Sequence, residues 1–360
     1  MDKKIYVEAP KNSYKKIMNN KFIFKNPRQR IVILKILEEI QFVKEQVENI
    51  CNNNSLKNIQ MAQDKLFDAL DMFLKNVKHL EPGIKNDILL PRLKQFFRDS
   101  IGGHLFKSRY FRRGYTKPKG YPGDYQIIEA MYNNNPISKG VGYLFDKYFL
   151  QVDYVRAVRD RKDSMKGFLK RFIYDYPVKE IKILNIACGS CREIRELIVE
   201  GSLRRQKISF NLIDQDKGAL NFAKKEIAAL IYSQRLKFNF FQYNVNKFVM
   251  KKNFMQKKFG QQDLIYSIGL ADYLPDSILG PLVAFSFHLL NKGGKLIVAH
   301  KNVRRFTAYA PDWLCDWKFF PRDKVEFLSL IKKYLGEAIY NSQFLFDKNQ
   351  MVYYCILKKR

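Results

Sequence analysis

The sequence predicts an α/β protein, in which helices cover both faces of a mostly parallel sheet and a helical domain precedes that sheet. Two observations carry this expectation. After Pro177, short apolar runs alternate with segments of helical spacing, which is the pattern of strands linked by crossover helices. Before residue 102, apolar residues recur mainly at helical spacing. We therefore divide the chain into a helical N-terminal domain (1–101), a helical substrate or lid region (102–177) and a sheet domain (178–360).

The N-terminal domain is expected to form two or three amphipathic helices between Arg28 and Arg98. Apolar residues lie three or four positions apart in this stretch, so they line one face of each helix. Turn residues at 52–55 and at 81–83 separate the helices. The simplest function of such a domain is packing against the rest of the protein.

The next segment, from Gly102 to Gly140, is rich in Gly, Pro, Tyr and basic residues. Its most distinctive part is RRGYTKPKGYPGDY at 112–125, which we expect to be neither helix nor strand. Helical spacing returns from Tyr143 to Tyr174. That helix carries a basic face, formed by Arg156, Arg159, Arg161 and Lys162.

Parallel strands are expected over 181–187, 208–213, 237–243, 263–267 and 295–299, with helices over 218–230 and 277–290 and another after the first strand. Two further strands, 337–346 and 350–357, are separated only by a short turn. A short turn makes such strands antiparallel, so the sheet should end with one reversed strand.

The charge of the chain is unusual, because 65 Lys and Arg against 35 Asp and Glu leave a net charge of +30. A hydrophobic content of 46% excludes a wholly disordered basic chain. The charge should attract anions, such as nucleic acid, an anionic membrane surface or an acidic protein. No Lys/Arg block is long enough to form an independent nucleic-acid tail, so nucleic acid stays open but is not favoured.

Five scattered cysteines do not suit a disulfide framework, which favours a reduced, cytoplasmic protein. No apolar stretch approaches the roughly 20 residues of a membrane helix, and we expect no signal peptide. The four histidines lack ligand-like spacing, and the Cys188-x-x-Cys191 pair lacks a second pair, so we expect no metal site.

A ligand site is expected where the first strand runs into a small-residue turn and then a helix. The turn contains Ala187, Cys188, Gly189 and Ser190. Backbone N–H groups in such a turn can closely approach a ligand at the carboxyl ends of parallel strands. The turn lacks the three-glycine dinucleotide fingerprint and the P-loop, so an adenosine ligand without phosphate fits it better.

The ends of the next three strands add polar groups to this site. Asp214 and Gln215 end the second strand, and the Asp214 carboxylate could accept hydrogen bonds from both ribose hydroxyls. Asn244 and Val245 follow the third strand, where an amide could bond the adenine edge. The turn from Ser267 to Gly269 follows the fourth strand, and we expect it beside the group to be transferred.

These motifs resemble those of class I S-adenosylmethionine-dependent methyltransferases: ILNIACGSCREI, FNLIDQD, QYNV and LLNKGGKLIV. The resemblance implies a Rossmann-like sheet of seven strands with the last one antiparallel, and S-adenosyl-L-methionine as the cofactor. From Tyr110 onward, KPKGYPGDYQIIEAMY, RAVRDRK and DLIYSIGLADYL are also similar to the methyltransferases implicated in making 3-hydroxy fatty acid methyl ester signals. The turn departs from the wider family, with Ala187 and Cys191 where glycines are usual.

The closer resemblance implies O-methylation of a carboxylate on a small or fatty-acyl (3-hydroxy acid) substrate. A carboxylate is already nucleophilic at neutral pH, so this reaction needs no general base. The candidates on the acceptor side are Tyr121 and Asp124 in the GYPGDY loop, with Asp272 and Tyr273 after the fourth strand. Helix capping and aromatic packing are the structural alternatives for them. Residues that could pair with a carboxylate or a phosphopantetheine phosphate are Arg112, Arg113, Lys117, Arg159 and Arg161.

Two other functions stay open. An RNA or protein methyltransferase could use the basic helical region to grip a polymer, although the turn after the fourth strand lacks the Asn/Asp-Pro-Pro-Tyr arrangement typical of base methylation. A non-catalytic binding module could keep the fold and use its charge for a partner, but Asp214 favours a working cofactor site. For the enzyme, the expected partners are an anionic small-molecule or acyl substrate, and an acidic acyl carrier protein or a membrane surface.

Overall fold

The computed structural model describes residues 27–52, 58–84, 88–203, 207–231, 234–305, 308–336 and 342–360. The chain divides into two compact units, Met1–Ile101 and Gly102–Arg360. In the described part of the chain, no helix is long and apolar enough to cross a membrane.

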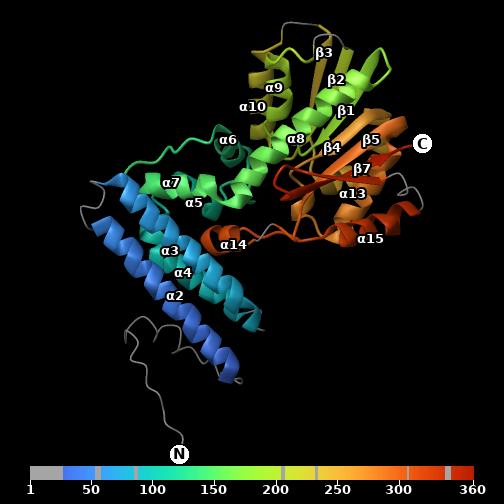
Figure 1. Ribbon diagram of the computed structural model, residues 1–360. Helices are drawn as coiled ribbons and strands as arrows, with labels where there is room; N and C mark the ends of the chain where they lie inside the picture. The colour runs from blue at the N-terminus through green and yellow to red at the C-terminus, as the bar shows by residue number, and fades with distance from the viewer. Residues whose placement is uncertain are drawn as a thin grey trace, which may run out of the picture. The chain divides into compact units, whose positions relative to one another are not determined.

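Helices α2 (Pro27–Asn52), α3 (Ile59–Leu80) and the start of α4 (Leu89–Leu105) form the first unit, with a short 3-10 helix, η2 (Glu81–Gly83), before α4 (Figure 1). The Asn58 side chain caps α3 by accepting a hydrogen bond from the Met61 N–H. Buried Leu66, Leu70 and Phe73 follow the helical period, and Phe73 stacks on Phe97 of α4 with 4.3 Å between ring centroids. These helices confirm the expected helical region. The turn expected over 52–55 lies outside the described residues, except for the last residue of α2.

The segment 102–177 belongs to the second unit and forms α5 (Arg109–Thr116), α6 (Tyr125–Asn133), α7 (Val141–Gln151) and α8 (Asp153–Asp175). The expectation that 112–125 contains no helix is therefore wrong at its start. The Ser108 side chain caps α5, and the helix ends only at Lys117, whose φ of 47° is left-handed. Gly114 lies inside α5, whereas both prolines and the other two glycines of the stretch lie after Lys117, in the loop between α5 and α6.

The second unit also contains a seven-stranded sheet. Its strands are β1 (Glu180–Ile186), β2 (Lys207–Asp214), β3 (Leu236–Gln242), β4 (Gln262–Ser267), β5 (Leu290–Lys301), β6 (Ser342–Phe346) and β7 (Val352–Lys358), in the order β3-β2-β1-β4-β5-β7-β6. Strands β1 to β5 pair in parallel, whereas β7 runs antiparallel to both β5 and β6. This topology confirms the expected Rossmann-like sheet, which is the arrangement of class I methyltransferases.

In the final hairpin, β6 ends at Phe346 as expected, and β7 begins two residues later than expected, at Val352. Residues 337–341 of the first expected strand lie outside the described residues. Strand β5 begins earlier than expected, at Leu290. Besides α5, the sequence patterns missed α6 and four later helices: α11 (Val245–Met250), α12 (Lys252–Phe259), α14 (Tyr309–Cys315) and α15 (Lys324–Leu335). Two of these helices have fewer than eight residues, too few to show a helical period.

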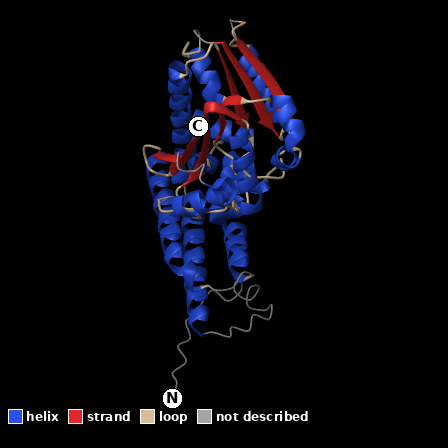
Figure 2. Cartoon of the chain, turned by 90° about the vertical axis from the view of Figure 1, so that its right-hand side faces the viewer, coloured by secondary structure: helices blue, strands red, loops and turns tan. Residues whose placement is uncertain are grey.

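Crossovers through α9 (Arg192–Val199) and α10 (Lys217–Ala228) lead to one edge of the sheet, and the crossover through α13 (Asp276–His288) leads to the other. Right-handed crossovers in opposite directions place these helices on opposite faces. Helices accordingly lie on both sides of the strands (Figure 2). The direction changes between β1 and β4, so their carboxyl ends border the crevice in which open α/β sheets bind ligands.

Candidate functional site

A cavity of about 500 Å³ lies at the carboxyl ends of β1, β2 and β4. Its walls come from the turn after β1, the end of β2, the start of α11, the turn after β4 and the loop before α6. Nine of the predicted cofactor residues line it: Ala187, Cys188, Gly189, Ser190, Asp214, Gln215, Asn244, Val245 and Gly269. The fold thus brings together side chains from four separate strand ends.

The turn after β1 is bent by left-handed residues at Ala187, Gly189 and Cys191, with φ values of 58°, 53° and 54°. The left-handed conformation is unfavourable for residues that carry a Cβ, so it costs roughly 1–2 kcal/mol at Ala187 and again at Cys191. A Cβ added at Gly189 would meet no heavy atom within 4 Å. Gly189 therefore leaves open space on the cavity wall, where a ligand can approach the backbone.

Asp214 is the acidic group at the centre of this wall, and its side chain is buried. Its two carboxylate oxygens accept the backbone N–H groups of Gly189 and Asp216, each at 2.8 Å. Burial raises the pKa of the Asp214 carboxyl, and these N–H groups counteract the rise. An ionised carboxylate has about four acceptor positions, so the backbone N–H groups leave acceptor capacity for a hydroxyl group of a ligand.

A mainly apolar wall adjoins Asp214. Tyr243, Val245 and Phe248 line the cavity at the start of α11. The Asn244 side-chain oxygen caps this helix by accepting the Lys247 N–H at 2.8 Å, which leaves its amide NH₂ as a donor. This wall suits a flat heterocycle with a polar edge.

The inner end of the cavity holds an acid and a base, Glu193 and Arg161, which are only 3% and 7% exposed. Asn185 and Tyr266 each donate a hydrogen bond to Oε1 of Glu193, and burial raises the pKa of that carboxyl. The Arg161 side chain lies against Gly269, and within the described part of the chain its Nε has no hydrogen-bond partner. A buried guanidinium with an unused donor is a candidate anion site.

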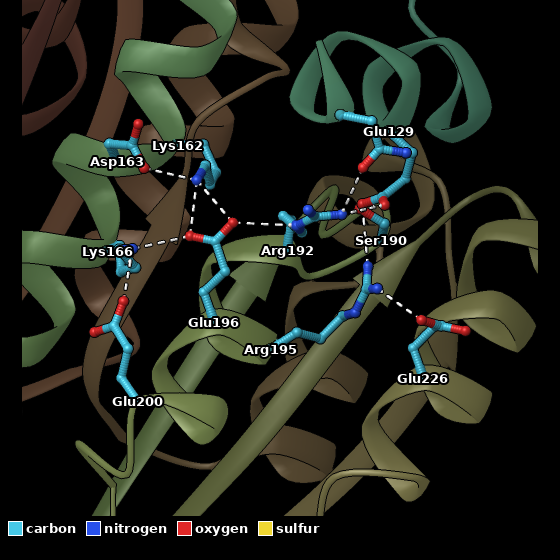
Figure 3. A network of polar contacts seen from close by, with 11 residues as sticks. Glu129, Lys162, Asp163, Lys166, Ser190, Arg192, Arg195, Glu196, Glu200 and Glu226 are labelled. Carbon is cyan, nitrogen blue, oxygen red and sulfur yellow. Dashed lines mark hydrogen bonds and ion pairs between the residues drawn. The ribbon is translucent and has the colours of Figure 1, made fainter. Parts of the chain in front are cut away.

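Helix α6 is tied to the turn after β1 by one buried acid, Glu129 (Figure 3). The Ser190 hydroxyl donates to Glu129, and Arg192 and Arg195 pair with it at 2.9 and 3.1 Å. Ser190 was predicted to bind the cofactor, but its hydroxyl group donates its hydrogen bond to Glu129 instead. Sequence reasoning missed Glu129, whose only signal is its place on the buried face of a short helix.

The four predicted acceptor-side residues separate into two pairs. Tyr121 and Tyr273 line the cavity. Asp124 does not line it, because this carboxylate caps α6 and pairs with Arg113 Nε at 2.9 Å. Asp272 also lies away from the cavity wall, in the core.

Asp272 is the centre of a buried charged cluster. Its carboxylate accepts the Lys301 ammonium at 2.7 Å and the Lys301 backbone N–H at 2.8 Å, and Arg161 lies 3.9 Å away. Burial alone would raise the pKa of Asp272, but Lys301, His300 and Arg161 outweigh it and hold that pKa well below its ordinary value. The Asp272 carboxylate of this cluster thus helps to hold the Arg161 guanidinium in place.

Ser267 is likewise away from the cavity, because its hydroxyl is buried and donates to the Ile186 carbonyl at 2.8 Å. Of the basic candidates, Arg161 and Lys117 line the cavity. Arg159 donates instead to the backbone carbonyls of Met131 and Leu150. Lys117 pairs with Asp316 at 3.0 Å.

The acceptor wall is closed by contacts between the GYPGDY loop and the segment after α14. Gly123 has a φ of 76°, and a Cβ there would stand 2.9 Å from the Trp317 ring. The Tyr273 hydroxyl accepts the Trp317 indole N–H at 2.9 Å and lies 3.3 Å from the Tyr154 hydroxyl. Burial raises the pKa of Tyr273 to about 12 and also raises that of Tyr121.

The cysteines of the turn are free thiols. Cys188 and Cys191 are buried, and burial raises the pKa of both, so they stay protonated at neutral pH. Among the described residues, no group of three or more His, Cys, Asp or Glu side chains could hold a metal ion.

Comparison with known proteins gives neighbours of the same fold. No family model and no curated protein matches the chain. A solved "possible exported protein" of Bordetella parapertussis is 15% identical, with a TM-score of 0.50 over 66% of this chain and 79% of that one. The likeness is one of fold.

Two further solved structures are more distant. Magnesium protoporphyrin IX methyltransferase of Synechocystis is 10% identical, with a TM-score of 0.41 over 58% of this chain and 89% of that one. An O-methyltransferase family protein of Burkholderia thailandensis is 14% identical, with a TM-score of 0.38 over 59% of this chain and 62% of that one.

Proposed function

We propose that this protein is an S-adenosylmethionine-dependent methyltransferase that O-methylates the carboxylate of a small or fatty-acyl 3-hydroxy acid. The observation that carries the proposal is the placement of Asp214. Its carboxylate lies at the end of β2, is oriented by two backbone N–H groups and lines the cavity beside Gly189. Such a carboxylate suits the two hydroxyls of a ribose.

The other walls of the cavity fit the remaining parts of this cofactor. Tyr243, Val245 and the Asn244 amide would hold the adenine. Glu193 and Arg161 both line the cavity, and they would bind the ammonium and the carboxylate of the amino-acid group, respectively. When bound, S-adenosylmethionine supplies a methyl group on a positively charged sulfur, which a carboxylate oxygen can take by direct displacement.

The acceptor wall supports a substrate that is already ionised. Raised pKa values keep the phenols of Tyr121 and Tyr273 protonated at neutral pH, so neither can remove a proton from an alcohol. Among the described residues that line the cavity there is no histidine, and Asp316 is engaged by Lys117. A carboxylate needs no base. Lys117 and Lys318 line the same wall with Asp316, which lies 3.0 Å from the first ammonium and 3.6 Å from the second, so these three side chains carry a net positive charge that would attract an anion.

The acceptor class can be tested with labelled cofactor and cell extract. The extract is divided into untreated, nuclease-treated and protease-treated portions, and each is incubated with the protein. We expect label in an organic-soluble product that mild base hydrolyses, since a methyl ester has both properties. Asp214→Ala protein serves as the control for background labelling. Label that disappears after nuclease or protease treatment would instead identify RNA or protein as the acceptor.

Arg161 gives a second prediction, because it is assigned to the cofactor's carboxylate. Arg161→Met should weaken binding of S-adenosylhomocysteine about tenfold to 100-fold, since a charged hydrogen bond contributes about 1.5–3 kcal/mol. Methylthioadenosine lacks the amino-acid group, so its affinity should change little. Calorimetry with both ligands measures the difference. A normal S-adenosylhomocysteine affinity with a raised KM for the acceptor would assign Arg161 to the acceptor anion instead.

A further inference from the structure

Residues 227–262 carry a local charge that the cofactor site does not use. This stretch contains no Asp or Glu, and it has seven basic residues. Five of them are exposed lysines at the start and along the length of α11 and α12, and none forms an ion pair with another described residue: Lys247, Lys251, Lys252, Lys257 and Lys258. The surface of these two helices is therefore positive without local compensation.

Apolar side chains stand among these lysines. Met250 is 83% exposed and Phe254 is 50% exposed. The same helices bury Phe248, Met255 and Phe259 in the core, so their inner face is already packed. The side chains of Met250 and Phe254 therefore do not pack in the hydrophobic core, and their exposure to water is unfavourable.

Two of the lysines lie close to aromatic rings. The Lys258 ammonium lies 5.8 Å from the Phe254 ring centroid and 5.9 Å from that of Tyr243, and the Lys247 ammonium lies 5.0 Å from the Tyr243 centroid. We name the surface formed by Met250, Phe254 and the five lysines the α11–α12 face. Cations around exposed apolar side chains are the composition of an interfacial membrane anchor.

We propose that the α11–α12 face binds an anionic lipid surface. Met250 and Phe254 enter the boundary between headgroups and acyl chains, while the lysines lie against lipid phosphates. Nucleic acid would use the lysines but would gain little from an exposed methionine, so lipid accounts for both kinds of side chain. Val245 and Phe248 of α11 line the cavity, so the bound membrane would adjoin the site itself.

The proposal is tested by sedimentation of the full chain with vesicles of phosphatidylcholine, alone or mixed with phosphatidylglycerol. We expect binding only to the mixed vesicles, weakened by salt. Phe254→Ser combined with Met250→Ser should reduce the partition about tenfold without changing the net charge. Lys251→Glu combined with Lys252→Glu should reduce it at least as much.

Matched controls separate this face from the charge of the whole protein. Lys170→Glu combined with Arg171→Glu changes the net charge equally at exposed positions of α8, and Tyr174→Ser removes another exposed ring. Both controls should bind vesicles nearly as well as the wild type. If the two charge reversals act alike, or if the serine variant binds normally, the proposal is overturned. Binding of RNA that depends on the α11–α12 lysines but not on Phe254 would also overturn it.

Discussion

Asp214→Ala is expected to lower the affinity for S-adenosylmethionine about 100-fold, to the limit of detection by titration calorimetry. The variant loses two charge-assisted hydrogen bonds to the ribose, together about 3 kcal/mol, which is about two decades in Kd. It also releases the Gly189 and Asp216 N–H groups, so the turn after β1 loses its orientation. Loss of methyl transfer should follow at every cofactor concentration that can be reached in practice.

The matched control is Asp216→Asn, two residues further along. Asp216 caps α10 by accepting the Gly218 N–H, and asparagine keeps that role. Its effect on cofactor affinity should stay below about threefold. If the wild-type protein gave no heat of binding with S-adenosylmethionine, the proposal that it is a methyltransferase would be contradicted. Thermal melting of both variants shows whether any loss comes from unfolding.

Asp272→Asn is expected to destabilise the second unit by about 3 kcal/mol or more in urea unfolding. The substitution removes the carboxylate that pairs with the buried Lys301 and Arg161 side chains, and breaking a buried pair from one side costs about 3–5 kcal/mol. Asp272→Leu combined with Lys301→Met removes both charges and should recover part of the loss. If Asp272→Asn were as stable as the wild type and only slowed turnover, Asp272 would be a reacting group instead.

The same pair predicts two pH effects in separate ranges of pH, and in both ranges stability rises as the pH rises. The depressed pKa of Asp272 gives stability that is present above the ordinary carboxyl pKa of about 4 and is lost as the pH falls below it. Burial lowers the pKa of Lys301 to about 8. From about 8 to about 10.4 the unfolded chain therefore binds more protons than the folded one, so wild-type stability relative to Lys301→Met should rise with pH. If the difference in unfolding free energy between the wild type and Lys301→Met did not change over this pH range, the lowered pKa of Lys301 would be contradicted.

The sheet and the cofactor turn were predictable because their signals are local. A buried strand shows as a short apolar run, and the residue that ends it lies at the carboxyl edge of the sheet, as Asp214 does. Such a signal does not tell which way an acidic side chain points. Asp124 and Asp272 each follow a loop that contains glycine, yet Asp124 caps a helix and Asp272 lies in the core.

Arg161 was predictable in part. It lies four residues after Ala157 and four before Met165, both buried, so helical spacing places it on the inner face of α8. Its neighbours are Tyr132 of α6, Asp272 in the short 3-10 helix after β4, and Lys301 at the end of β5, all more than 20 residues away in the sequence. Contacts of that range depend on packing, and no local pattern encodes them.

The Glu129 contacts divide the acceptor side into a fixed part and an exchangeable one. Because α6 is bound to Ser190, Arg192 and Arg195, it behaves as an extension of the cofactor turn. The preceding loop, Lys117 to Gly123, is held by other contacts: Lys119 pairs with Asp216 at 3.4 Å, Lys117 pairs with Asp316, and Gly123 packs beside Trp317. If the proposed function holds, substitutions in this loop would change the acceptor wall and leave the Glu129 contacts of α6 unchanged.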